Sequence, residues 1–123
     1  MHKLLAIGGL ASALLAIHPA LAADAEVGAK VFKTQCGACH SAAAGKNLIG
    51  PSLHRVVGRQ SGTIEGFRYS AANKGANLTW DAATLDRYLI NPKAMVPGTT
   101  MTFAGLKNDT QRADVVAYLT TLK

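Results

Sequence analysis

The sequence predicts an all-α domain of three or four helices joined by long loops. In three segments, apolar residues recur at intervals of three and four, which places them on one face of a helix. Residues 45–77, by contrast, are rich in Gly, Pro, Asn and Ser and show no alternation typical of strands. A loop of this length is uncommon in a small domain, so we expect it to wrap around something other than protein.

The first helix is predicted over residues 26–36. Its apolar face carries Val27, Val31 and Phe32. Asp24 is available as the N-cap, and Glu26 adds a negative charge in the first turn, where it offsets the helix dipole. This helix ends at the two cysteines of the chain.

The second helix is predicted to begin after Thr79 or Asp81 and to end at Ile90. Its buried face carries Leu85, Tyr88 and Leu89. Asn91 precedes a proline, and this disfavours helical backbone at that residue.

The last helix is predicted over residues 109–122, after an irregular segment in which Pro97-Gly98 suits the centre of a type II turn. Its buried stripe consists of Val115, Val116, Tyr118, Leu119 and Leu122. Lys123 follows at the end of the helix, where positive charge is favourable. Bulky apolar side chains are few for so much irregular backbone, so a large apolar cofactor would help to complete the core.

Residues 1–22 have the pattern of a cleaved secretory signal peptide. Lys3 precedes an apolar stretch over residues 4–17, and Ala20 and Ala22 stand at the two positions that the signal peptidase reads. The stretch is shorter than the roughly 20 residues that a membrane-spanning helix needs. We therefore expect export to the periplasm, cleavage near Ala22 and a single domain over residues 23–123. A retained N-terminal anchor is the alternative.

The chain is basic, with 13 Lys and Arg against 7 Asp and Glu. Removal of Lys3 with the leader reduces the net charge from +6 to +5. The charges are spread along the sequence and, together with export, argue against a nucleic-acid partner. We expect a monomer without stable membrane insertion, and steering toward an acidic protein partner stays open.

The segment Cys36-Gly37-Ala38-Cys39-His40 has the spacing of the attachment motif for c-type haem. Two thiols at this spacing add across the two vinyl groups of the porphyrin, while the adjacent imidazole reaches the iron from the same side. We therefore expect one haem c, covalently attached through Cys36 and Cys39, with His40 as the proximal ligand of the iron.

Three other uses of the same residues are weaker. A dithiol redox centre normally lies in a βαβ context that this sequence lacks. A structural zinc site needs four ligands, and after residue 22 the only other histidine is His54, with no further cysteine. A structural disulfide fits an exported protein, but it gives His40 no role.

The function depends on the ligand at the opposite face of the iron, for which Met101, Met95 and His54 are the candidates. An open position predicts gas binding or peroxidase-like chemistry, whereas a protein ligand predicts electron transfer. Met101 lies in an irregular segment after the Pro97-Gly98 turn, and a neutral thioether favours the ferrous state. Most methionines pack in cores, so position alone leaves the choice open.

Five segments cover nearly the whole of residues 23–123: CGACH, GPSLHRVVGR, GFRYSAANKGANLTW, LDRYLINPKAMVPGTTMTFAGL and RADVVAYL. Together and in this order they closely resemble the class I cytochromes c, in particular the mitochondrial-like bacterial members. The resemblance implies a small class I cytochrome c fold wrapped around one covalently bound haem. It also implies an electron carrier and not an enzyme.

The resemblance implies roles for individual residues. The family's thioether cysteines correspond to Cys36 and Cys39, and its axial ligands to His40 and Met101. Pro51 falls where the family's proline carbonyl accepts the imidazole N–H. The remaining positions either support the methionine side, namely Tyr88, Asn73 and Thr99, or receive the buried haem propionate, namely Arg59, Tyr69 and Trp80. Residues at the family's crossing of the terminal helices are Gly28, Phe32 and Tyr118.

His54 and Met95 fall at positions that the family does not use as ligands. Gln35 and Thr100 depart from the family, because lysines often surround the exposed haem edge there. The implied partners are membrane electron-transfer complexes of a respiratory or photosynthetic chain: a cytochrome bc1-type donor, and an oxidase or a photosynthetic reaction centre as acceptor. A periplasmic protein that shuttles single electrons between them is the predicted function.

Two functions from other classes compete with this prediction. A haem enzyme or gas sensor requires an iron position opened by loss of Met101, yet no distal acid–base histidine is evident. A thiol–disulfide oxidoreductase requires redox-active thiols at Cys36 and Cys39 and no haem.

Overall fold

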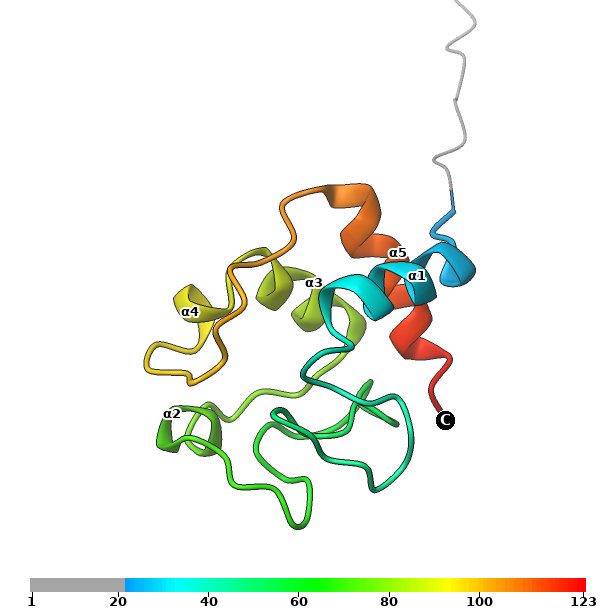
Figure 1. Cartoon of the computed structure of the whole chain (residues 1–123). Helices are drawn as coiled ribbons and strands as arrows, with labels where there is room; N and C mark the ends of the chain where they lie inside the picture. The colour runs from blue at the N-terminus through cyan, green and yellow to red at the C-terminus, as the bar shows by residue number, and fades with distance from the viewer. Residues whose placement is uncertain (1–21) are drawn as a thin grey trace, which may run out of the picture.

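The computed structural model describes residues 22–123, so the predicted leader lies outside the described residues apart from Ala22. Within that range the chain forms five helices (Figure 1): α1 over Ala25–Gln35, α2 over Ala71–Lys74, α3 over Ala82–Ile90, α4 over Pro92–Met95 and α5 over Asp109–Thr120. β structure in the described part is limited to an isolated bridge between Gln60 and Thr79. The prediction of an all-α fold with long loops is confirmed.

Helix α1 begins where the sequence predicts, because the Asp24 carboxylate accepts hydrogen bonds from the backbone N–H groups of Glu26 and Val27 at 2.9 and 3.1 Å. Its buried residues are Gly28, Val31 and Phe32. The prediction for Val27 is wrong, since its side chain is 40% exposed. Helix α5 crosses α1 at Gly28, and the buried stripe therefore begins there.

Helix α3 begins after Asp81, whose Oδ1 accepts the Thr84 N–H at 2.7 Å, so Asp81 and not Thr79 is the cap. The predicted buried residues of this helix, Leu85, Tyr88 and Leu89, are all buried. Asn91 ends α3 and also caps α4, with Pro92 at the first turn of α4. Neither α4 nor α2 is predicted from the sequence, because four residues are too few to show a helical period.

Helix α5 begins at Asp109, where the Asn108 side chain accepts the Gln111 N–H at 2.9 Å, and it ends two residues earlier than predicted. Of the predicted stripe, Val115, Val116 and Leu119 are buried, whereas Tyr118 and Leu122 are half-buried. Arg112 is also buried, which the apolar pattern does not predict. Its guanidinium pairs with Asp86 and Asp109, both at 2.8 Å, and thereby joins α5 to α3.

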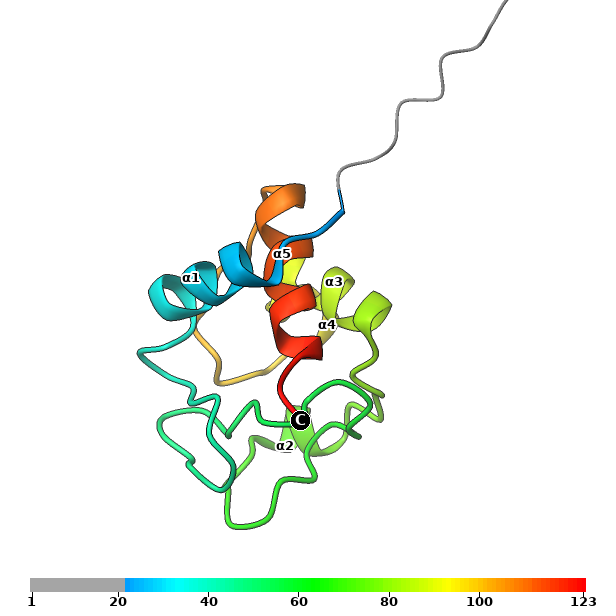
Figure 2. The ribbon, with the colours of Figure 1, turned by 90° about the vertical axis from the view of Figure 1, so that its right-hand side faces the viewer.

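The first and last helices cross in close contact, as both views of the ribbon show (Figures 1 and 2). A Cβ atom on Gly28 would lie 1.9 Å from the backbone oxygen of Asp114, so only glycine permits this approach. Beside it, the rings of Phe32 and Tyr118 pack with their centroids 5.3 Å apart. This crossing fixes the end of α1, and with it the position of the cysteine segment.

Candidate haem-binding site

The segment Cys36–His40 turns sharply at the end of α1. The backbone N–H groups of Cys39 and His40 both donate to the Cys36 carbonyl, at 3.1 and 2.9 Å. Both thiols are free and half-buried. Burial, with a smaller contribution from the neighbouring Cys39, raises the pKa of the Cys36 thiol to about 11. The nucleophilic thiolate is therefore scarce at neutral pH, which disfavours dithiol redox chemistry.

The imidazole of His40 is held by the loop that follows. Its Nδ1 lies 2.7 Å from the carbonyl oxygen of Pro51, and because a carbonyl only accepts, Nδ1 carries the proton. Burial lowers the pKa of His40, and the hydrogen bond to Pro51 only partly opposes this shift. The ring is therefore neutral at neutral pH, with a lone pair on Nε2 that suits a metal ion.

Gly50 lies against the same imidazole and is a site residue that the sequence analysis missed. A Cβ atom at this position would come within 2.3 Å of His40 Cε1 and 2.6 Å of Nδ1. Its N–H donates to the Cys39 carbonyl at 2.7 Å, which ties the loop to the cysteine segment. The only local signal is a glycine directly before Pro51, and this is equally typical of an ordinary turn.

Met101 is half-buried and is held from two directions. The hydroxyl of Tyr88, on α3, donates to Met101 Sδ at 3.2 Å. The backbone N–H of Met101 donates to Thr99 Oγ1, also at 3.2 Å. Burial raises the pKa of Tyr88 to about 12, so its hydroxyl keeps the donated proton at neutral pH.

The turn that precedes Met101 has the geometry predicted for it. The Thr99 N–H donates to the Val96 carbonyl at 3.1 Å, and Gly98 between them has φ +87°. This is the positive φ that the third residue of a type II turn requires. The turn therefore fixes the direction in which the chain enters the methionine.

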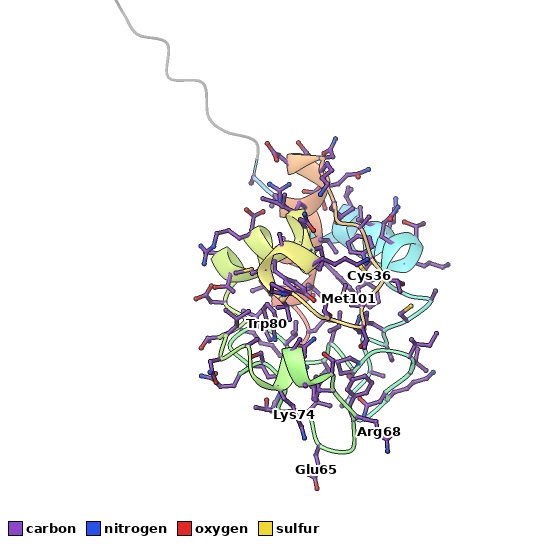
Figure 3. All side chains as sticks on the ribbon, turned by 90° about the vertical axis from the view of Figure 1, so that its left-hand side faces the viewer. Cys36, Glu65, Arg68, Lys74, Trp80 and Met101 are labelled. Carbon is purple, nitrogen blue, oxygen red and sulfur yellow. The ribbon has the colours of Figure 1, made fainter. Side chains whose placement is uncertain are left out.

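The indole ring of Trp80 packs on the ring of Tyr88, with their centroids 4.7 Å apart. In the view of Figure 3, Trp80 and Met101 lie toward the middle of the molecule, whereas Glu65, Arg68 and Lys74 lie at its lower edge. The interior around the methionine is therefore aromatic, and the charged side chains labelled in that view are remote from it.

Arg59 is half-buried and anchored on the loop that carries Pro51. Its guanidinium donates to the carbonyls of Ser52, at 2.9 Å, and His54. Burial lowers the pKa of Arg59, although its interaction with Tyr69 partly opposes this. The Tyr69 hydroxyl accepts the Ile64 N–H at 3.0 Å. Arg59 and Tyr69 are thus brought together, and the backbone N–H of Trp80 donates to the backbone carbonyl of Arg59 at 2.8 Å.

The side chains of three other residues considered from the sequence take no part in these contacts. Asn73, on α2, makes a hydrogen bond through its backbone N–H to Ser70 Oγ at 3.1 Å, and the structure shows none between its side chain and another described residue. His54 is half-buried, and its carbonyl contacts Arg59. Met95 ends α4 and packs against the apolar core.

The donor set of the described residues fits a c-type haem. Two free thiols at the attachment spacing lie beside a neutral imidazole whose Nε2 is free of protein partners. Gly50 leaves space beside the His40 imidazole that any larger side chain would fill. A thioether with its own hydroxyl donor supplies a soft ligand. The fold and the site are those of a small protein that carries one covalently attached haem.

Comparisons with known proteins show which family this chain belongs to. A sequence profile of the cytochrome c family matches residues 25–123. Cytochrome c of Euglena viridis is 50% identical over 100 residues, which cover 81% of this chain and 98% of the relative. Cytochrome c2 of Blastochloris viridis is 47% identical over 120 residues, which cover 97% of this chain and 92% of the relative. The chain belongs to the cytochrome c family.

Family membership makes the chain an electron carrier and not an enzyme. It carries one haem c, covalently attached through Cys36 and Cys39. Between residues 22 and 123, no helix has both the length and the apolar character that crossing a bilayer requires.

Proposed function

We propose that His40 and Met101 are the two axial ligands of the haem iron and that the protein shuttles single electrons between membrane redox complexes. The hydrogen bond from the buried Tyr88 hydroxyl to Met101 Sδ is the observation that carries this proposal. Thioether sulfur is a weak acceptor, and a methionine that only fills space needs no donor. On the other side, the Pro51 carbonyl fixes the His40 tautomer that leaves Nε2 available.

When bound, the haem supplies an iron that alternates between the ferric and ferrous states. The chain contributes two ligands that its own hydrogen bonds hold in place, His40 through Pro51 and Met101 through Tyr88 and Thr99. Because these contacts exist before any partner docks, little structural change need accompany the gain or loss of an electron. A neutral thioether ligand favours the ferrous form and so raises the reduction potential.

We assign the buried haem propionate to Arg59, Tyr69 and Trp80. The guanidinium of Arg59 is fixed by two backbone carbonyls and supplies a positive charge inside the loop region. Its interaction with Tyr69 supports a shared polar site. Asn73 and Thr99 are proposed to support the methionine side of the haem. For Thr99, the hydrogen bond from the Met101 N–H favours this role.

Replacement of Met101 by Ala tests the axial ligand, with Met95→Ala as the matched control. We expect the holoprotein of Met101→Ala to have a lower reduction potential and to bind added imidazole or cyanide, because one iron position is opened. The Met95→Ala protein should do neither, since Met95 packs in the core. Unchanged potential and ligand binding in Met101→Ala would mean an iron already open in the native protein, as in a haem enzyme or gas sensor.

We propose that residues 1–22 are a signal peptide, that residues 23–123 form one domain, and that the mature protein is periplasmic. The three-part pattern of the leader supports this. The Blastochloris viridis alignment covers 97% of the chain and therefore extends into the leader, whereas the Euglena viridis alignment covers 81%. The intact mass of exported protein tests it: residues 23–123 plus one haem is the expected value, and a mass that retains the leader contradicts it.

The proposed partners are a cytochrome bc1-type donor and, as acceptor, an oxidase or a photosynthetic reaction centre. The positive net charge of the chain supports partners with acidic docking surfaces. It also supports a monomeric carrier that dissociates quickly from them. Electron-transfer rates with isolated complexes should fall as ionic strength rises, because screening weakens the attraction. Rates that do not respond to salt would contradict electrostatic docking.

A further inference from the structure

Asp114 joins α5 to the residue that precedes α1. Its side chain is buried, with only 6% of the residue exposed, and its Oδ1 accepts the backbone N–H of Asp24 at 2.8 Å. This hydrogen bond spans 90 positions of the sequence. It therefore fastens the beginning of the folded domain to its last helix.

No positive side chain among residues 22–123 pairs with Asp114. The ion pairs of the described part both involve Arg112, whose partners are Asp86 and Asp109. Asp114 Oδ2 accepts no hydrogen bond from another described residue. A buried carboxylate without a counter-charge is costly, and none of the described residues supplies a positive charge to this one.

We infer that removal of the leader supplies this counter-charge. On this inference, which rests on the proposed cleavage after Ala22, the new α-ammonium group of Ala23 pairs with the Asp114 carboxylate and strengthens the docking of α1 on α5. In the unprocessed chain the same nitrogen is a neutral amide. Processing therefore adds a positive charge at the point where the folded domain begins.

The distances permit this pairing. One residue spans at most about 3.6 Å, so the Ala23 nitrogen lies within about 6.4 Å of Asp114 Oδ1, given the 2.8 Å from the Asp24 nitrogen. Ala23 is exposed and precedes the helix, so rotation about its own backbone bonds moves the freed ammonium group. Three carboxylates lie near this position. Asp24 and Glu26 belong to the start of α1, whereas Asp114 belongs to the opposing helix α5.

A double-mutant cycle on the processed holoprotein measures the pairing. One change is acetylation of the α-amine near pH 6.5, where lysine side chains stay protonated. The other is Asp114→Asn, which keeps the size of the side chain. We expect acetylation to raise the equilibrium constant of unfolding in urea about threefold in the native chain, in the range of partly exposed ion pairs, and to leave it unchanged in Asp114→Asn. Equal effects in both chains, or none in either, would overturn the inference.

A second measurement needs no substitution and covers the case in which Asp114→Asn does not fold. The α-amine is labelled by reductive ¹³C-methylation, which preserves its charge, and is titrated by NMR. We expect its pKa in the folded holoprotein to exceed the value in 8 M urea; an equal or lower value contradicts the pairing. The intact mass is recorded first. A terminus other than Ala23 removes both the cleavage proposal and this inference, whereas the correct mass with no coupling removes only the inference.

Discussion

Tyr88 and Met101 are joined by an O–H···S hydrogen bond of 3.2 Å between α3 and the segment that follows α4. The donor is buried, and its ring is fixed by packing on Trp80. The contact links α3 to the proposed axial ligand. A substitution at Tyr88 is therefore expected to change the properties of the haem iron.

Replacement of Tyr88 by Phe is expected to lower the reduction potential of the haem. The hydrogen bond draws electron density from the thioether, which makes Met101 a weaker donor to ferric iron, and its loss therefore favours the ferric state. Because the ring remains, the free energy of unfolding should change by only about 1 kcal/mol. Spectroelectrochemical titration measures the potential.

Tyr118→Phe is the matched control for this experiment, since the Tyr118 ring packs on Phe32 and its hydroxyl makes no hydrogen bond with another residue in the range 22–123. An equal shift of potential in the two variants would remove the role that we give to the Tyr88 hydroxyl.

Deprotonation of Tyr88 is expected to destabilise the protein at high pH. Burial raises its pKa from the ordinary value of 10.0 to about 12. The folded state therefore holds this proton more tightly than the unfolded state, and the associated stability is complete below pH 10. It should decline by about 2–3 kcal/mol as the pH rises from 10 through 12.

Urea unfolding of the native protein and of Tyr88→Phe, at matched pH values between 9 and 12, isolates this contribution from the titration of lysines. We expect the native curve to fall more steeply. Parallel curves for the two proteins are incompatible with a strongly raised pKa at Tyr88.

Replacement of Gly28 by Ala is expected to separate α1 from α5. The added Cβ would meet the backbone oxygen of Asp114 at 1.9 Å, and backbone atoms cannot swing aside as a side chain does. We expect a loss of about 3 kcal/mol in the free energy of unfolding. Gly75→Ala is the control, because the nearest atom there lies at 3.4 Å and φ is −89°. Similar losses of unfolding free energy in both variants would show that the close approach of α1 and α5 at Gly28 is not the cause.

Replacement of Gly50 by Ala is expected to disturb the proximal imidazole without preventing haem attachment. Cys36 and Cys39 are untouched, so the thioether bonds should form, whereas the new Cβ would press on His40. Displacement of the ring that costs about 1.4 kcal/mol raises the affinity for added imidazole about tenfold. Intact mass and spectroscopic ligand titration measure the two effects. Native ligand affinity in this variant would mean that the loop shifts and the ring does not.

The three long helices were predictable because each shows a helical period of apolar side chains. Asp24 and Asp81 were also available as caps for the first two, whereas the cap of α5, Asn108, was identified only in the structure. Helices α2 and α4 depend on single caps, Ser70 and Asn91, and have no room for a period. The sequence therefore indicates where long helices begin, but it does not indicate where a loop contains a helix of a single turn.

The site divides in the same way. The cysteines and His40 form a local motif, so their chemistry is evident from five consecutive residues. Contacts such as Gly50 on the imidazole, or Asp114 on the Asp24 N–H, join residues that no spacing rule relates. Tyr88 and Met101 were paired through family resemblance alone. Periodicity reports which face of a helix is buried, and gives no information on what lies against it.

The contact of α1 with α5 also orders events in time. Helices α1 and α5 lie at opposite ends of the described residues, so their packing requires closure of a long stretch of chain and is expected to form late in folding. The attachment cysteines directly follow α1, so they are expected to stay accessible for haem attachment until this contact forms. Docking of α5 is then expected to fix the haem-bearing segment in its final position.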